Sequence, residues 1–177
     1  MDDNKKKIAF IINPISGTQG KEHILKWLDE KLDKNRYMPE VIYTEWAGHA
    51  VEIAARKAKE EVFAVVAIGG DGTINEIARS LVHTKTALGI IPCGSGNGLA
   101  RHLQIPMEAK KAIDIINEGL IDIIDYGKIN DVPFFCTCGV GFDAFVSLQF
   151  SKAGRRGPLI YLEKTLLESL KYKPETY

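Results

Sequence analysis

Short apolar runs alternate with stretches of helical period through the first 125 residues, and this alternation limits the fold more than any other feature. Continuous runs rich in Val and Ile fall at 8–12, 62–68 and 88–91, and a weaker candidate falls at 40–44. Such runs are typical of strands that are buried on both faces of a parallel sheet. The alternation therefore predicts an α/β fold, an open and mostly parallel sheet with helices on both faces.

Segments between and after these runs repeat their apolar residues every three or four positions, as one face of a helix does. The predicted helices cover residues 21–32, 48–60, 74–81 and 109–117, with a short one at 99–101. Gly119 follows the helix at 109–117, at the position where glycine commonly ends a helix. Each predicted strand is thus followed by a helix that can cover the sheet.

The pattern changes after this alternating region. Two consecutive strands are predicted at 121–129 and 133–140, and a further helix at 159–170. The sequence therefore predicts two domains, an α/β domain over 1–125 and the start of a β-rich domain over 126–177. The second stretch is too short to close a sheet and bury a core, which predicts that the chain is a piece of a longer protein.

Composition excludes several classes of protein. Lys plus Arg (23) balances Asp plus Glu (23), so the chain lacks the positive field that a nucleic-acid-binding protein needs. Three cysteines do not make a disulfide framework, and no metal site built on them is expected. Cys136 and Cys138 lack partners at ligand spacing, so they are expected as small side chains on one face of a strand.

Targeting segments are also missing from the sequence. The apolar run 8–12 follows three lysines but is too short for a signal peptide. No run approaches the roughly 20 apolar residues that cross a bilayer. The sequence therefore predicts a cytoplasmic protein, and a transient contact with a membrane surface stays open.

Three loops rich in glycine follow three of the predicted strands, at 13–20, 69–72 and 92–98. Glycine lets a phosphate group approach the main chain, and the helix that follows each loop offers unpaired N–H groups to an anion. Because ligands of open α/β sheets bind at the carboxyl ends of the strands, the three loops are expected to converge on one phosphorylated ligand. Their spacing matches neither a Walker A motif nor the dinucleotide-binding fingerprint.

Asp71 stands out because it lies inside the Gly-Gly-Asp-Gly loop. A carboxylate among phosphates would be repelled unless a Mg²⁺ ion or a substrate hydroxyl lay beside it. Thr73 and Glu76 have two interpretations of equal weight. They fit a capping box that closes the helix N-terminus, and they also fit contacts to a ligand.

The three loops resemble the diacylglycerol kinase catalytic-domain family, which includes bacterial lipid kinases and sphingosine kinases. The motifs are Asn-Pro-x-Ser-Gly at 13–17, Gly-Gly-Asp-Gly-Thr-x-Asn-Glu at 69–76 and Pro-x-Gly-Ser-Gly-Asn at 92–97. Thr44, with the Gly-His-Ala that follows it at 48–50, also looks like a family element. The stretch 138–144 looks like the start of the family's second domain.

The resemblance implies a two-domain kinase, with an α/β domain that binds ATP, a β-sandwich and a substrate cleft between them. It implies Mg²⁺-dependent transfer of the γ-phosphoryl group of ATP to a lipid hydroxyl, in which Asp71 matches the essential carboxylate and is the catalytic candidate. The residues that match family positions contacting nucleotide or its metal are Asn13, Ser16, Gly17, Thr44, Gly70, Asp71, Gly72, Thr73, Asn75, Glu76, Gly94 and Ser95.

Two departures from the family leave alternatives open. Gly98 stands where many members have Asp, and members extend roughly 100 residues further, as a complete second domain would. The carboxylates proposed as general base in bacterial members lie in that stretch. The alternatives are an ATP-binding fragment without catalysis and, ranked lower, an NAD kinase, which shares the Gly-Gly-Asp-Gly motif. The expected partners are ATP and a lipid or another small hydroxyl compound; a homodimer through an open sheet edge is also allowed.

Overall fold

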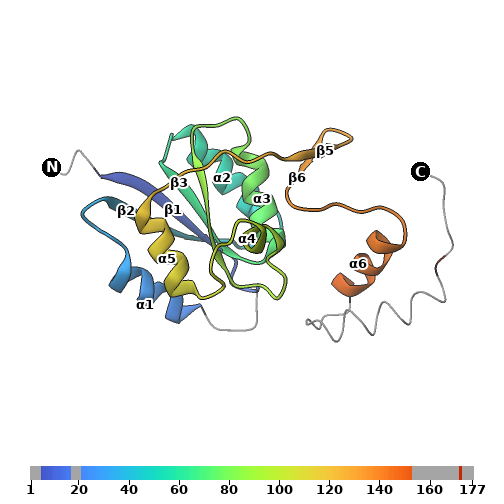
Figure 1. The fold of residues 1–177 in the computed structure, drawn as a ribbon, viewed down its shortest axis with the longest axis horizontal. Helices are drawn as coiled ribbons and strands as arrows, with labels where there is room; N and C mark the ends of the chain where they lie inside the picture. Colours follow the sequence, from blue (N-terminus) through green and yellow to red (C-terminus); the bar gives the residue numbers. More distant parts are fainter. Residues whose placement is uncertain (1–4, 17–20, 153–171, 173–177) are drawn as a thin grey trace. The chain divides into compact units, whose positions relative to one another are not determined.

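The computed structural model describes residues 5–16, 21–152 and 172, and Figure 1 shows the order of the elements along the chain. The chain divides into two compact units, residues 1–136 and residues 137–177. Each unit is described by itself below. The domain boundary that the sequence places after residue 125 stays a prediction.

Four parallel strands form the sheet of the first unit, in the order β2–β1–β3–β4. Their bounds are β1 Lys6–Ile12, β2 Tyr37–Tyr43, β3 Ala64–Gly69 and β4 Ala87–Pro92. The register pairs Ile12 with Tyr43 on one side and with Ile68 on the other, and Ile68 pairs with Ile91. The carboxyl ends of the four strands therefore lie in one row, and the predicted open parallel sheet is confirmed.

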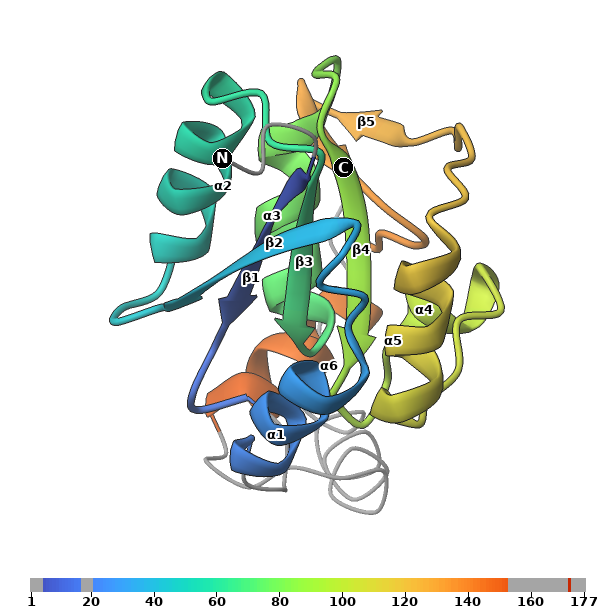
Figure 2. The same ribbon diagram turned by 90° about the vertical axis from the view of Figure 1, so that its left-hand side faces the viewer.

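Helices cover both faces of this sheet, as the alternating sequence predicts (Figure 2). Side chains of α1 and α5 pack on one face, and side chains of α2 and α3 pack on the other. The helices of this unit are α1 Glu22–Lys31, α2 His49–Lys59, α3 Asp71–Leu81, α4 Gly98–His102 and α5 Ala109–Glu118. Gly119 follows α5 in the left-handed conformation, with a φ of 67°, which confirms the predicted helix end.

The central strands supply both hydrophobic cores because successive side chains of a strand point to opposite faces. Phe10 and Val66 lie in the core beneath α1 and α5, whereas Ile11 and Ala67 lie in the core beneath α2 and α3. All four are fully buried. This two-sided burial explains why the sequence of these strands is continuously apolar rather than alternating.

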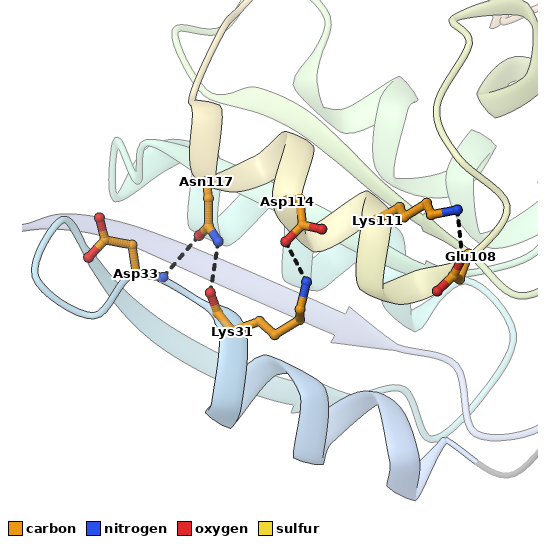
Figure 3. A network of polar contacts seen from close by, with 6 residues as sticks. All are labelled: Lys31, Asp33, Glu108, Lys111, Asp114 and Asn117. Carbon is orange, nitrogen blue, oxygen red and sulfur yellow. Dashed lines mark hydrogen bonds and ion pairs between the residues drawn. The ribbon is translucent and has the colours of Figure 1, made fainter.

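A set of polar contacts ties the end of α1 to α5 (Figure 3). The ammonium of Lys31 lies 2.6 Å from a carboxylate oxygen of Asp114. The side-chain amide of Asn117 donates to the carbonyl of Lys31 at 2.8 Å and accepts the N–H of Asp33 at 2.9 Å. Because α1 begins just after the first glycine loop, these contacts hold the helix that follows that loop beside α5.

The segment after α5 differs from the sequence prediction of two long strands. The structure has only a short antiparallel hairpin, β5 Gly127–Ile129 and β6 Val132–Phe134, and residues 121–126 pair with no strand in the described part of the chain. Asn130 and Asp131 form its turn, both with positive φ, as the turn of a two-residue hairpin requires. The prediction was therefore wrong for 121–126 and 135–140, where no neighbouring strand supplies a pairing partner.

The two cysteines of this region are also corrected. Cys136 and Cys138 are exposed and lie outside any strand. Cys136 has a φ of 82°, in the left-handed region, which is incompatible with a regular strand. The expectation that both side chains line one face of a strand is therefore wrong.

The second unit is described only in part. It contains α6, Phe142–Lys152, in which Val146 is buried. The ring of Tyr172 lies 5.3 Å from that of Phe142 and 5.6 Å from that of Phe145, measured between ring centroids. The helix predicted at 159–170 lies outside the described residues, and the start of a β-sandwich stays a prediction. No helix in the described ranges is long and apolar enough to cross a membrane.

Candidate functional site

The loops after β3 and β4 meet backbone against backbone. A Cβ atom built on Gly94 would lie 2.8 Å from the Cα of Gly70, which is closer than such atoms approach in proteins. The N–H of Cys93 donates to the carbonyl of Gly69 at 2.8 Å and continues the pairing of the two strands into the loops. Glycine at 94 is thus required by packing, and the meeting point presents main chain without side chains.

Asp71 is the first residue of α3 and connects these two loops. One carboxylate oxygen, Oδ2, accepts the N–H of Asn97 at 2.8 Å, and the other, Oδ1, accepts the N–H of Gly98 at 2.7 Å. The residue is exposed. Because each carboxylate oxygen has two lone pairs, Asp71 can hold the start of α4 and still offer acceptor capacity to a ligand.

Asn97 shapes the loop after β4 from within. It is 3% exposed and adopts the left-handed conformation with φ 54° and ψ 50°. Its side-chain oxygen accepts the N–H of Gly94 at 3.1 Å, and its side-chain nitrogen donates to the carbonyl of Gly94 at 2.6 Å. Asn97 was part of a motif but not among the predicted site residues. Its tolerance of left-handed backbone was the available signal.

The first loop is tied to the start of α3. The side-chain nitrogen of Asn13 donates to the hydroxyl oxygen of Thr73 at 3.1 Å, and its side-chain oxygen accepts the N–H of Ile15 at 3.1 Å. The hydroxyl of Ser16 donates to the carbonyl of Asn13 at 3.0 Å. The structure therefore brings together three predicted site residues: Asn13 and Ser16 from the loop after β1, and Thr73 from α3.

The capping box proposed for Thr73 and Glu76 is absent. The helix α3 begins at Asp71 with Gly70 as its N-cap residue, and no described side chain caps it. Thr73 therefore lies inside the helix rather than before it, and its hydroxyl accepts a hydrogen bond from Asn13 instead. The capping interpretation is wrong because the helix begins three residues earlier, at Asp71, than a cap at Thr73 would require.

The remaining predicted site residues lie around the same row of strand ends. Thr44 follows β2 directly, is 8% exposed, and donates its N–H to the carbonyl of Ile12 at 2.8 Å. The others occupy the first two turns of α3 or the exposed loop before α4; they are Gly72, Asn75, Glu76 and Ser95. Gly17 lies outside the described residues.

Lys21 is a residue of this region that the sequence analysis missed. It precedes α1, is 9% exposed, and donates from its ammonium to the hydroxyl oxygen of Ser16 at 2.6 Å. Nothing in the spacing of the motifs distinguishes it from the other lysines of the helix. Only its burial in the folded chain does so.

An aromatic pair lies on the loop between β2 and α2. The rings of Trp46 and His49 stack with centroids 3.8 Å apart and planes 7° apart. The ring nitrogen Nδ1 of His49 accepts the N–H of Glu45 at 3.1 Å, which fixes the histidine at the first position of α2. Trp46 is 53% exposed and was not among the predicted site residues.

The donor set of the strand ends fits a phosphorylated ligand. Backbone N–H groups, hydroxyls, an amide and one ammonium come from loops after three strands, and such groups bind phosphate oxygens. Among the described residues, no group of three or more His, Cys, Asp and Glu side chains could hold a metal ion. A Mg²⁺ ion fits here only with Asp71 as a protein ligand beside phosphate oxygens and water, as Mg²⁺ sites at nucleotides commonly are.

The fold and the loops place this chain among α/β proteins whose ligands bind at the carboxyl ends of the strands. Residues 7–129 match the family described as diacylglycerol kinase catalytic domain. The chain belongs to the diacylglycerol kinase catalytic-domain family, and the resemblance seen in its motifs is confirmed.

Individual relatives agree with the family match. The chain is 35% identical over 132 residues to a diacylglycerol kinase of Staphylococcus saprophyticus, covering 73% of this chain and 43% of that protein. It is 36% identical over 140 residues to a diacylglycerol kinase of Bacillus subtilis strain 168, covering 77% and 46%. A crystal structure of a diacylglycerol kinase from Bacillus anthracis str. Sterne superposes with a TM-score of 0.65 at 25% identity, covering 73% and 48%. The chain thus spans about half the length of the relatives it matches.

Proposed function

We propose that this chain is the ATP-binding part of a lipid kinase, which transfers the γ-phosphoryl group of ATP to a lipid hydroxyl with the help of Mg²⁺. The observation that carries the proposal is the contact of Gly70 with Gly94, directly beside the Asp71 carboxylate. It combines main chain that a phosphate can approach with one carboxylate in position for a metal or a hydroxyl.

Phosphoryl transfer depends mainly on positioning and on neutralising charge, so these residues need little chemistry of their own. In the proposal, the N–H groups of the loops after β3 and β4 bind phosphate oxygens, and Asn13, Ser16 and Thr73 contact the nucleotide from the first loop. Mg²⁺, when bound, supplies charge neutralisation at the phosphates. Asp71 orients that ion or the accepting hydroxyl while its two hydrogen bonds to backbone N–H groups keep its own position.

The acceptor belongs to the proposal as well. The relatives named above are diacylglycerol kinases, and a lipid hydroxyl is therefore the first acceptor to test. The chain spans about half of those proteins, so activity of this chain alone is part of the proposal. The proposal also includes a cytoplasmic location and a transient contact with a membrane surface. An ATP-binding fragment without catalysis is the alternative.

The test offers γ-labelled ATP and Mg²⁺ to the purified chain, with a total lipid extract in one tube and NAD in another. Label in the organic phase supports a lipid kinase and shows that these residues suffice. Label in a nicotinamide product would contradict the lipid proposal in favour of an NAD kinase. ATP binding without transfer to either acceptor would support the fragment. Asp122→Asn is the control for a substitution at Asp71, because Asp122 is exposed and far from the loops in sequence.

A further inference from the structure

Arg79 joins the last turn of α3 to a segment 54 residues further along the chain. Its side-chain nitrogen Nε donates to the carbonyl of Pro133 at 2.9 Å. Pro133 lies in β6, and among the described strands β6 pairs only with β5, so its other edge presents main-chain groups without a strand partner. Arg79 therefore supplies a hydrogen bond that a neighbouring strand would supply, and it holds the hairpin against α3.

Two aromatic residues hold the hairpin at its ends. Before β5, the hydroxyl of Tyr126 lies 3.0 Å from the ring nitrogen Nε2 of His83, two residues after the end of α3. After β6, Phe135 packs against the core beneath α2 and α3, and its ring centroid lies 5.9 Å from that of Tyr126. A hairpin of two three-residue strands is at best marginally stable alone, so its position in the first unit depends on these contacts.

Cys136, the residue after Phe135, reaches the start of α4. A Cβ atom built on Gly98 would lie 3.2 Å from the thiol sulfur of Cys136 and 3.7 Å from Oδ1 of Asp71. The same oxygen of Asp71 accepts the N–H of Gly98 at 2.7 Å. The thiol therefore lies directly beside the residue that Asp71 holds, in the space that the absence of a side chain at position 98 leaves open.

The backbone of Cys136 adopts a conformation that residues with a Cβ atom disfavour. Its φ of 82° lies in the left-handed region, where such residues are strained. Cys136 is exposed, so burial of its side chain does not offset the strain. Strain of this kind persists where surrounding contacts hold the backbone, and it clusters at functional sites. The hydrogen bond of Arg79 and the burial of Phe135, just before Cys136, are contacts that can hold it.

These contacts connect the two ends of α3 through the segment 133–136. Asp71, the first residue of α3, accepts the N–H of Gly98, and Arg79, in the last turn of α3, binds the carbonyl of residue 133. The segment runs from the contact with Arg79 to the contact of Cys136 with Gly98. A shift of the segment therefore reaches the N–H group that Asp71 accepts.

We propose that the segment 133–136 positions the start of α4 for the candidate site, and that Arg79 is the positioning residue that fixes this segment. Arg79 fixes the carbonyl of Pro133, the segment places Cys136 against Gly98, and Gly98 keeps its N–H on Asp71. The carboxylate then presents its remaining lone pairs in a fixed direction. The expected effect on a nucleotide rests on the proposed function, whereas the expected effect on Gly98 does not.

The first measurement follows the backbone amide resonance of Gly98 in the isotopically labelled, ligand-free chain of 177 residues. Arg79→Met is expected to shift this resonance and to speed the hydrogen exchange of the Gly98 N–H, although Arg79 lies about 12 Å along α3 from Asp71. The control is Arg56→Met, at an exposed arginine of α2, which is expected to leave the resonance unchanged. An unshifted Gly98 resonance in Arg79→Met would overturn the inference.

The second measurement is the MgATP affinity of Arg79→Met and Cys136→Gly by isothermal titration. Each variant is expected to bind MgATP about 2- to 10-fold more weakly, the equivalent of about one hydrogen bond. Arg56→Met is expected to bind it as the unchanged chain does. Affinity equal to that of the unchanged chain in both test variants would also overturn the inference.

Urea unfolding of Cys136→Gly separates positioning from folding. Glycine adopts a φ of 82° without strain, so this variant is expected to be at least as stable as the unchanged chain while its affinity falls. A loss of affinity in step with a loss of stability would contradict a positioning role. If the unchanged chain binds no MgATP, the proposed function itself fails, and the Gly98 resonance still decides whether Arg79 positions the start of α4.

Discussion

Asp71 has a structural task in this chain besides the role its motif implies. Both of its carboxylate oxygens accept backbone N–H groups, from Asn97 and Gly98, and so fix the loop after β4 and the start of α4. From the sequence alone, only a metal ion or a substrate hydroxyl is expected beside this carboxylate. A substitution at Asp71 therefore acts on the loop as well as on any bound ligand.

The Asp71→Asn variant is expected to lose activity and also some stability. The asparagine keeps one oxygen, but its NH₂ group faces a backbone N–H that has lost its acceptor. A net loss of about 0.5–1.5 kcal/mol in the free energy of unfolding is expected, as for one hydrogen bond. Urea unfolding measures it, with Asp122→Asn as the exposed control. Unchanged stability would show that the two hydrogen bonds contribute nothing, and full phosphoryl transfer would remove Asp71 from the catalytic role.

Gly94, in the loop after β4, and Gly72, in the first turn of α3, give a matched pair of predictions. Gly94→Ala would place its Cβ 2.8 Å from the Cα of Gly70, so the two loops must move apart. Overpacking of this kind costs about 1–3 kcal/mol, and ATP binding is expected to fall with it. Gly72→Ala places its Cβ in open space within α3, where alanine is favoured by about 0.5–1 kcal/mol. Thermal unfolding of both variants tests the contact, which is contradicted if Gly94→Ala is as stable as Gly72→Ala.

At the scale of single residues, the sequence predicted where the loops lie better than it predicted the hydrogen bonds within and between them. The glycine pattern and the strand ends can be predicted locally because both depend on neighbouring residues. The hydrogen bonds of Asn97 and the burial of Lys21 depend on loops that only the folded chain brings together. The capping interpretation of Thr73 was wrong because α3 begins at Asp71, so that Thr73 lies inside the helix.

Among the elements, helices and buried strands followed the sequence, whereas the region after α5 did not. An amphipathic helix or a continuously apolar strand carries its own signal in its period. A strand such as the one predicted over 121–129 needs a partner, and apolar residues alone do not specify one. The exposed side chains of Ile121 and Ile123 show the outcome, since this stretch has strand composition without strand pairing in the described chain.

A buried lysine connects α2 to the edge strand β2. The ammonium of Lys57, which is 6% exposed, lies 2.8 Å from carboxylate oxygens of both Glu40 and Glu60. Burial alone would lower the pKa of Lys57, but hydrogen bonds to the two glutamates outweigh it and raise the pKa above 10.5. The hydrogen bond from Lys57 lowers the pKa of Glu60 below 4.5.

These shifts predict how stability depends on pH. The contribution of Glu60 is present above its unfolded-state pKa and is lost as pH falls through its lower folded-state pKa. The contribution of Lys57 is present below 10.5 and is lost as pH rises through its higher folded-state pKa. The stability difference between the unchanged chain and Lys57→Met is therefore expected to be larger at about pH 7 than at about pH 3. Urea unfolding at both pH values tests this prediction, with Lys26→Met as control. An equal stability difference at the two pH values would contradict a contribution from the ion pairs.

For the whole molecule, the first unit carries every described residue of the predicted site. The four-stranded sheet, both cores and the glycine loops all lie within residues 1–136. Family membership was predicted from three motifs and is confirmed over residues 7–129. The identity of the acceptor was not predictable, because the chain spans about half of its relatives.

The central claim is that the loops at the carboxyl ends of β1, β3 and β4 form one site for the phosphates of a nucleotide. A direct test records the amide resonances of the isotopically labelled chain by NMR during a titration with MgATP. We expect the largest shifts to cluster in residues 13–16, 69–73 and 93–98, around the contact of Gly70 with Gly94. Shifts that cluster elsewhere in the first unit, or no shifts at saturating MgATP, would contradict it.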